Sequence, residues 1–305
     1  IPKTLFTKKG DGELITLVTA TDENDEAEYI AEKCVELLDK GVPATEIAIL
    51  FRANFQSRVL EEAFIKYSLP YKVLGVRFFE RREIKDVLSY YRASLDPESL
   101  SDVKRIINTP VRGLGKTSLL KLFAGKRNEL PQGVNMKIEG FFSLLSEIRK
   151  YHEAHNVSET LKYITRASGL EDSLKSGDPD DLERLQNIGE LVTLSTRYDL
   201  LPKEEGVLKL FTDAALESAD DGVGKSKNGI TLMTVHAAKG LEFIHVFIGG
   251  LEEGLFPHER LANDGVDKEE ERRLFYVAMT RAKEKLYLTY ADTRSMFGTR
   301  LITIP

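Results

Sequence analysis

The amino-acid sequence predicts an α/β protein in which a parallel β-sheet domain is interrupted by an inserted all-α domain. Strand and helix patterns alternate from residue 14 to residue 92, helical patterns dominate from 98 to 220, and the alternation returns from 230 to 290. Strands that alternate with helices form parallel sheets covered on both faces. We therefore predict a sheet domain over residues 1–95 and 222–305, and a helical insertion over residues 96–221.

The first stretch contains three strand signals, each followed by a helix. Short apolar runs predict strands over residues 14–19, 47–51 and 71–74. The first of them, LITLVT, is typical of a buried strand. Apolar residues at helical spacing predict helices over residues 23–38, 57–67 and 83–92.

The middle and last stretches complete the pattern. Helical signals between loops rich in Gly, Asp, Asn and Pro cover residues 102–107, 117–123, 140–149, 181–194 and 204–217. Afterwards the sequence predicts strands over residues 230–235, 243–248 and 285–290, with one helix over residues 269–279. An α/β pattern that stops and resumes indicates one domain inserted into another.

Composition excludes several classes of protein. With 305 residues, 42% of them hydrophobic, the chain can bury two modest cores. Cys34 has no second cysteine to pair with, which excludes a disulfide framework and favours a reducing cytoplasm. No apolar run approaches the about 20 residues of a membrane span. The net charge of −6 argues against a broadly basic surface but allows a local basic groove for nucleic acid.

Two tripeptides resemble the end of a phosphate-binding loop. They are Gly115-Lys116-Thr117 and Gly224-Lys225-Ser226. The full loop has the pattern G-x-x-x-x-G-K-[ST], and its first glycine lets the backbone wrap the phosphates. Pro110 and Ala219 stand at the positions of that glycine, and neither tripeptide follows a predicted strand. We expect no phosphate-binding loop in this chain.

The most informative run is GITLMTVHAAKGLEFIHVFIGGLEEGLFP, which places several functional groups in one turn between two predicted strands. Polar residues at the carboxyl end of a strand lie where open α/β sheets bind ligands. Lys239 is suited to phosphate and Glu242 to ribose hydroxyls, while Gly240 allows close approach of the backbone. The alternative is a solvated turn in which His236 is an ordinary hydrogen-bonded residue.

Arg281 precedes the last predicted strand, at the edge of the sheet. Its planar, permanently charged guanidinium is suited to a phosphoryl group in transfer. The alternative is a surface arginine paired with Glu270 or Glu284.

Two further segments mix cations with aromatic residues or glycines. Arg77 lies beside Phe78 and Phe79, which suits a single strand through backbone charge and base stacking. A half-buried helix entry is the alternative for these residues. The run TPVRGLGKT, which includes Arg112 and Lys116, is suited to a duplex phosphate clamp, and its alternative is a plain helix–helix turn.

Together these segments resemble superfamily 1 DNA helicases of the UvrD/PcrA/Rep type. TVHAAKGLEF is similar to motif V of that family, and RRLFYVAMTRAKEKL is similar to motif VI. FRANFQSRVLEE and GVRFFERREIKDVLSYYR are similar to its motif IVa region. The resemblance covers nearly the whole chain and is weakest over residues 129–219.

The resemblance implies a role for each matching position. Glu242 and Gly240 would bind ATP at the ribose, and Arg281 would be the arginine finger on the γ-phosphate. The DNA contacts would come from eight further positions and a stacking aromatic, namely His236, Lys239, Arg77, Arg52, Asn54, Gly113, Gly115, Lys116 and Phe297. The sheet domain would be the second RecA-like domain (2A), a P-loop NTPase fold without its own P-loop, and the helical block its insertion (2B).

The Walker motifs and the adenine-contacting glutamine motif of that family are absent from the chain, and its first residue is Ile1. We expect a piece of a longer, cytoplasmic 3′→5′ helicase whose absent N-terminal motor domain binds most of ATP and Mg²⁺. Its partners would be single-stranded DNA, a single-strand/duplex junction, and repair or replication proteins. Two alternatives remain: an ATP-independent DNA- or protein-binding module, and a part of a RecB/AddA-like nuclease-helicase.

Overall fold

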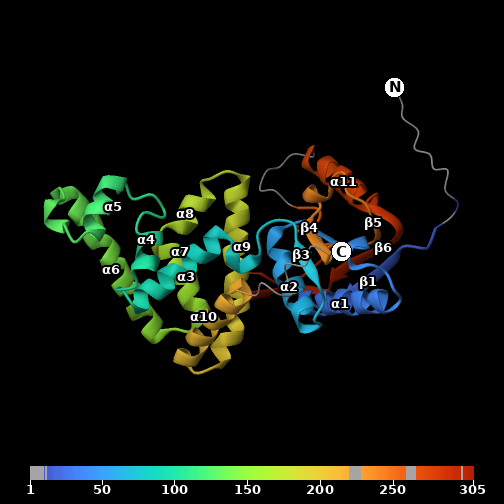
Figure 1. The fold of residues 1–305 in the computed structure, drawn as a ribbon, viewed down its shortest axis with the longest axis horizontal. Helices are drawn as coiled ribbons and strands as arrows, with labels where there is room; N and C mark the ends of the chain where they lie inside the picture. The colour runs from blue at the N-terminus through green and yellow to red at the C-terminus, as the bar shows by residue number, and fades with distance from the viewer. Residues whose placement is uncertain (1–9, 11, 220–227, 259–265, 297) are drawn as a thin grey trace. The chain divides into compact units, whose positions relative to one another are not determined.

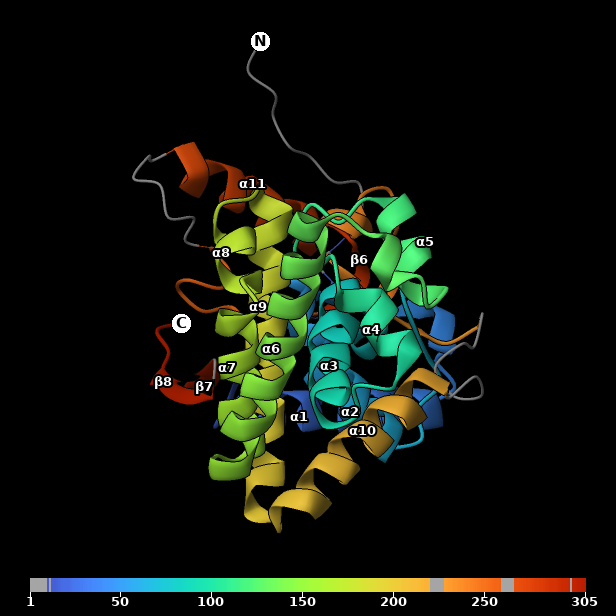
Figure 2. The ribbon, with the colours of Figure 1, turned by 90° about the vertical axis from the view of Figure 1, so that its left-hand side faces the viewer.

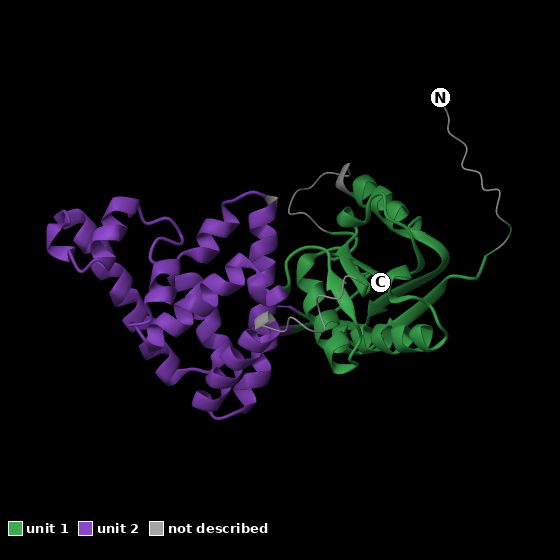
Figure 3. Ribbon diagram, viewed as in Figure 1, with its two compact units in different colours: residues 1–77, 220–295, 300–305 green, residues 78–219, 296–299 purple. Residues whose placement is uncertain are grey.

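The chain folds into two compact units. The computed structural model describes residues 10, 12–219, 228–258, 266–296 and 298–305. The first unit comprises residues 1–77, 220–295 and 300–305, and the second comprises residues 78–219 and 296–299 (Figure 3). We call them the sheet unit and the helical unit.

The sheet unit contains six strands, and every paired neighbour runs parallel. Their order across the sheet is β1-β6-β5-β2-β4-β3. The strands are β1 (Thr16–Ala20), β2 (Ile47–Phe51), β3 (Tyr71–Val73), β4 (Ile230–Thr234), β5 (Phe243–Ile248) and β6 (Ala282–Ala291). The predicted α/β fold class with a parallel sheet is confirmed.

Successive side chains of the central strands point to opposite faces of the sheet and build two hydrophobic cores, one on each face. Ile47 and Ile49 of β2 pack with α1 (Glu23–Asp39) and α2 (Ser57–Lys66). Ala48 and Leu50, which point the other way, pack on the face that carries α11 (Val266–Met279). Figure 1 shows α1 and α2 on one side of the sheet and α11 on the other. All five residues of β2 are buried, as expected for a strand covered on both faces.

The expectation that the first strand is buried was wrong. β1 is an edge strand that pairs only with β6, and its outward residue Leu17 is 65% exposed. Leu14, which precedes it, is 86% exposed. An apolar run therefore marked a strand correctly but not its place in the sheet.

The helical unit is built around α3 (Arg82–Leu95), against which α4, α6, α7 and α9 pack (Figure 2). Its other helices are α4 (Leu100–Ile106), α5 (Lys116–Phe123), α6 (Gln132–Ala154), α7 (Val157–Ala167), α8 (Leu170–Lys175), α9 (Pro179–Ser195) and α10 (Lys203–Ala219).

Short 3₁₀ turns occur along the whole chain, namely η1 (Ala44–Glu46), η2 (Asn54–Gln56), η3 (Phe78–Glu80), η4 (Arg127–Glu129), η5 (Thr196–Leu200) and η6 (His236–Ala238). β7 (Thr293–Met296) and β8 (Thr299–Ile302) form a separate two-stranded sheet.

The division between the units falls between residues 77 and 78, whereas the sequence predicted it between residues 95 and 96. The difference is α3, which periodicity alone placed with the sheet. Its buried side chains, among them Ile84, Val87 and Tyr91, belong to the core of the helical unit. None of the helices in the described part of the chain combines the length and the apolar character that crossing a membrane requires.

Candidate functional site

The segment from Val235 to Glu242 joins β4 to β5 and crosses the sheet on the face that carries α11. Val235 and Ala238 are buried with Phe243 in the core beneath α11, so the backbone is held on that face. Lys239 and Glu242 are exposed. Because β4 and β5 are parallel, the end of β4 and the start of β5 lie at opposite edges of the sheet, and the segment spans the distance between them.

The prediction that this whole turn lies at the carboxyl end of a strand is therefore correct only for its first part. His236 is the second residue after β4, but Glu242 directly precedes β5. Between them Gly240 adopts a φ of +86°, in the left-handed region where glycine is at no disadvantage. No atom lies within 4 Å of a Cβ built at Gly240, so the backbone faces open space there.

Arg281 lies between the end of α11 and the start of β6, and three groups hold its guanidinium. Nε donates to the carbonyl oxygen of Val277 at 3.0 Å, and Nη1 donates to that of Leu241 at 3.0 Å. Nη2 donates to the hydroxyl oxygen of Thr280 at 3.0 Å. The structure does not contain the alternative ion pair, because among the described residues Arg281 pairs with neither Glu270 nor Glu284.

These contacts bring Arg281 and Glu242 to one edge of the sheet. β5 and β6 are neighbours, and the N–H of Phe243 donates to the carbonyl oxygen of Arg281 at 2.9 Å. Residue 242 and residue 281 therefore stand at the starts of adjacent strands. A fixed cation next to an exposed carboxylate can contact a ligand that carries both an anionic group and hydroxyls.

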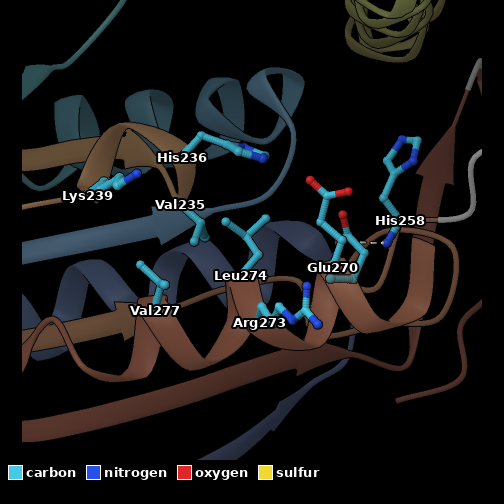
Figure 4. A pocket seen from close by; sticks show the side chains of 9 residues that line it. Val235, His236, Lys239, His258, Glu270, Arg273, Leu274 and Val277 are labelled. Atoms are coloured by element: carbon cyan, nitrogen blue, oxygen red, sulfur yellow. Dashed lines mark hydrogen bonds between the residues drawn. The ribbon is translucent and has the colours of Figure 1, made fainter. Parts of the chain in front are cut away.

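A cavity of about 270 Å³ lies between the crossing segment and α11. Figure 4 shows His236 and Lys239 along one wall, the α11 side chains Leu274 and Val277 along the other, and His258 at one end. The lining thus combines an apolar floor with a rim that carries both signs of charge. His236 and Lys239, two predicted DNA contacts, share this cavity.

Arg52 is held by an ion pair that the sequence did not reveal. Its Nε and Nη2 contact both oxygens of the Glu271 carboxylate at 2.8–3.1 Å, and the Arg52 side chain is only 12% exposed. The backbone N–H of His258 donates to the same carboxylate at 3.1 Å. Arg52 therefore links α11 to the backbone at His258 through the Glu271 carboxylate. Its role as a DNA contact stays a prediction. Asn54 lies in η2, is half-buried and has its own interactions.

Glu271 gives this ion pair a predicted pH dependence. Burial alone would raise the pKa of the carboxyl, but the hydrogen bonds from Arg52 and His258 outweigh it and lower the pKa. Such a group stabilises the fold above its unfolded-state pKa of about 4.3, and the stabilisation is lost as pH falls through the lower, folded-state pKa. We expect Glu271→Gln to lower the urea midpoint at pH 7, with a difference from the parent chain that shrinks below about pH 4.3.

The matched control is Glu269→Gln on the same helix, which removes an exposed pair with Arg272. Exposed pairs contribute little, so this variant should match the parent at every pH. A Glu271→Gln difference of constant size from pH 7 to the acid limit of folding would show that ionisation of this carboxyl is not the cause.

The cluster around Arg77 is a buried helix entry, which was the alternative interpretation. Phe78 and Phe79 are 1% and 3% exposed and pack edge to face at 5.1 Å. Their faces are therefore closed to bases, which corrects the stacking prediction. Arg77 is 9% exposed, and its Cζ lies 5.6 Å from the ring centroid of Tyr71.

The glycine-rich run in the helical unit is organised by Arg112. Its Nη1 and Nη2 donate to the carbonyl oxygens of Thr109 and Ser168 at 3.1 and 3.0 Å, and Nη2 also donates to the hydroxyl of Tyr90 at 2.7 Å. Arg112 is thus a structural tie of this loop, which corrects its predicted part in a phosphate clamp.

The remaining residues of this run stay accessible. Gly113 has a φ of +70°, Gly115 precedes α5 as its N-cap, and Lys116 is exposed at the first position of that helix. These three remain predicted duplex contacts. Phe297, the predicted stacking aromatic, lies outside the described residues.

The sequence interpretation missed a buried charged triad in the sheet unit. The guanidinium of Arg294 donates to the carboxylate of Glu252 at 2.6 and 2.7 Å and to that of Glu26 at 2.8 Å. All three side chains are at most 7% exposed. Glu26 lies 268 positions from Arg294, so no local pattern could have indicated this contact.

Comparisons with known proteins agree with the motifs. A family model described as "UvrD-like helicase C-terminal domain" matches residues 2–293. The chain is 38% identical to "ATP-dependent DNA helicase PcrA" of Staphylococcus epidermidis RP62A over 325 aligned residues. The alignment covers 100% of this chain and 44% of that protein. The protein of the same name from Staphylococcus aureus Mu50 is 37% identical over 318 residues, 97% of this chain and 43% of that protein. The chain therefore spans less than half the length of these curated relatives.

Proposed function

This chain belongs to the family of UvrD-like helicase C-terminal domains, and on that premise we propose that it is the C-terminal motor portion of an ATP-dependent DNA helicase that moves 3′→5′. The sheet unit would be the second RecA-like motor domain, and the helical unit its insertion. The bulk of ATP and Mg²⁺ would be held by a preceding motor domain that carries the phosphate-binding loop.

The observation that carries the proposal is the contact between Arg281 Nη1 and the carbonyl oxygen of Leu241 at 3.0 Å. It ties Arg281, in the segment similar to motif VI, to the residue that precedes Glu242 in the segment similar to motif V. Arg281 would stabilise charge on the terminal phosphate, and the Glu242 carboxylate would accept hydrogen bonds from the ribose. ATP would supply the anhydride bond whose hydrolysis drives movement.

The crossing segment, Val235 to Glu242, would connect the nucleotide contact to the DNA contacts. Its last residue, Glu242, lies at the amino end of β5, while His236, its second residue, lies close to the carboxyl end of β4. His236 and Lys239 would contact the single strand, Lys239 through a phosphate. A change at the nucleotide would reach the DNA contacts through seven residues of one continuous segment, from His236 to Glu242.

ATP turnover by the purified chain, with and without single-stranded DNA, tests whether the site for hydrolysis needs the preceding motor domain. We expect none, because the chain has no complete G-x-x-x-x-G-K-[ST] loop. The longer protein that includes the preceding motor domain should turn over ATP and do so faster with DNA. Turnover by this chain that disappears with Arg281→Ala would contradict the proposal, since a complete site would then lie here.

The two alternatives predict different results. A binding module that never uses ATP would leave the longer protein able to bind single-stranded DNA without DNA-stimulated turnover. A RecB/AddA-like enzyme would also cut DNA in the presence of Mg²⁺. The relatives reported above are named as DNA helicases, which favours the proposed helicase function over both alternatives.

A further inference from the structure

Thr280 connects Arg281 to the end of α11. Its hydroxyl donates to the carbonyl oxygen of Val277 at 2.8 Å and accepts from Arg281 Nη2 at 3.0 Å. We propose that Thr280 is a positioning residue that sets the direction of the Arg281 guanidinium toward the terminal phosphate of a bound nucleotide. This inference rests on the function proposed above for Arg281.

The hydrogen-bond inventory of Arg281 supports this role. A guanidinium has five N–H donors in a planar fork. Three are used on three separate anchors, which are the carbonyl oxygens of Val277 and Leu241 and the hydroxyl of Thr280. Within the described part of the chain no other acceptor engages them, so Nη1 and Nη2 each keep one N–H. Two such donors on neighbouring nitrogens suit bidentate contact with a phosphate.

Each anchor fixes a different part of the group. The two carbonyl contacts hold Nε and Nη1, and among the residues that the structure describes Thr280 alone accepts a hydrogen bond from Nη2. Thr280 can hold it because its hydroxyl proton is committed to Val277, which leaves an oxygen lone pair for the arginine. A β-branched side chain also has few rotamers, so the hydroxyl stays in place.

A role in stability alone does not account for this geometry. Thr280 is exposed, and substitutions at exposed positions usually change stability by less than about 0.5 kcal/mol. Orientation of a catalytic group is far more sensitive, since a misplacement of about 1 Å can lower a rate by about 10²-fold. The expected effect therefore appears in turnover rather than in folding.

The test uses the full-length protein that includes the preceding motor domain. Thr280→Val keeps the shape of the side chain but removes both hydrogen bonds, and we expect kcat for DNA-stimulated ATP hydrolysis to fall about tenfold. KM for ATP and affinity for single-stranded DNA should stay within about twofold. Thr280→Ser, which keeps the hydroxyl, should restore most of the rate.

A matched control is Thr212→Val in α10. Thr212 is also exposed and donates to a backbone carbonyl, that of Leu208 at 2.8 Å, but it holds no arginine. We expect normal kcat for this variant. Urea midpoints of both valine variants should match the parent, which excludes a folding defect as the cause.

A double variant separates this inference from the proposed function. If Thr280 acts only through Arg281, then Thr280→Val should cause no further loss in an Arg281→Ala protein. A further tenfold loss in that background, or a normal kcat for Thr280→Val alone, would overturn the inference while leaving Arg281 as the finger. Normal turnover by Arg281→Ala itself would overturn the proposed function and this inference with it.

Discussion

Arg281→Ala in the full-length protein is expected to lower DNA-stimulated ATP turnover by about 10³-fold or more. An arginine that stabilises charge on a phosphoryl group in transfer contributes about 10³–10⁵ in rate. Its guanidinium is already held by Val277, Leu241 and Thr280 at the amino edge of the sheet, so little ordering remains at the moment of reaction. The measurement is steady-state phosphate release with saturating single-stranded DNA.

Two controls make this result specific. Arg272→Ala removes a guanidinium from the same helix, but Arg272 is 75% exposed and pairs with the exposed Glu269, so turnover should be normal. Affinity for single-stranded DNA should be unchanged by Arg281→Ala, since the predicted DNA contacts lie elsewhere. Normal DNA-stimulated turnover by Arg281→Ala would remove Arg281 from the reaction.

Arg294→Met is expected to lower the free energy of unfolding by about 3–5 kcal/mol, because it leaves two buried carboxylates without their cation. Burial opposes the charge on Arg294, but the hydrogen bonds and charges of Glu252 and Glu26 outweigh it and raise its pKa. The arginine is therefore charged wherever the protein folds. Urea unfolding of this chain at pH 7 measures the loss.

Removing the charge of either glutamate should recover part of the stability that Arg294→Met loses. Glu26 accepts from the N–H of Gly250 and the hydroxyl of Thr289, and Glu252 accepts from the N–H of Ala291. Glutamine keeps an acceptor for each of these donors and carries no charge. Glu26→Gln and Glu252→Gln should therefore recover part of the stability lost in Arg294→Met.

A surface arginine provides the matched control for Arg294. Arg184→Met removes an exposed pair with Asp181 and should cost less than about 1 kcal/mol. If Arg294→Met were equally mild, the triad would not contribute as a buried charge network, and the 3–5 kcal/mol expectation would be wrong.

Local sequence patterns were sufficient to predict those elements and motifs that depend on neighbouring residues alone. The period of the apolar residues identified β2 and α1, because burial of one face imposes that period on the chain. The run TVHAAKGLEF could be recognised as a motif because the chemistry of its turn is compressed into ten adjacent residues. α7, α8 and the β7–β8 pair were not predicted. α8 and the two strands are short and carry little periodic signal.

The surroundings of charged side chains were the hardest feature to predict, because a charge in the sequence does not reveal its partner. Arg52, Arg77 and Arg112 all had the composition of nucleic-acid contacts. In the fold, Arg52 is paired with Glu271, Arg77 is buried beside Tyr71, and Arg112 ties together backbone carbonyls. An arginine 219 positions from its glutamate looks identical in the sequence to one that faces solvent.

Local periodicity was enough to predict the α/β fold class and the helical block between the two parts of the sheet unit. The strand order β1-β6-β5-β2-β4-β3, which makes β5 and β6 neighbours, became known only from the folded chain. That adjacency places Glu242 beside Arg281 although 39 positions separate them. Strand order is chosen by which apolar faces pack best together, and this is a property of the whole core rather than of any one segment.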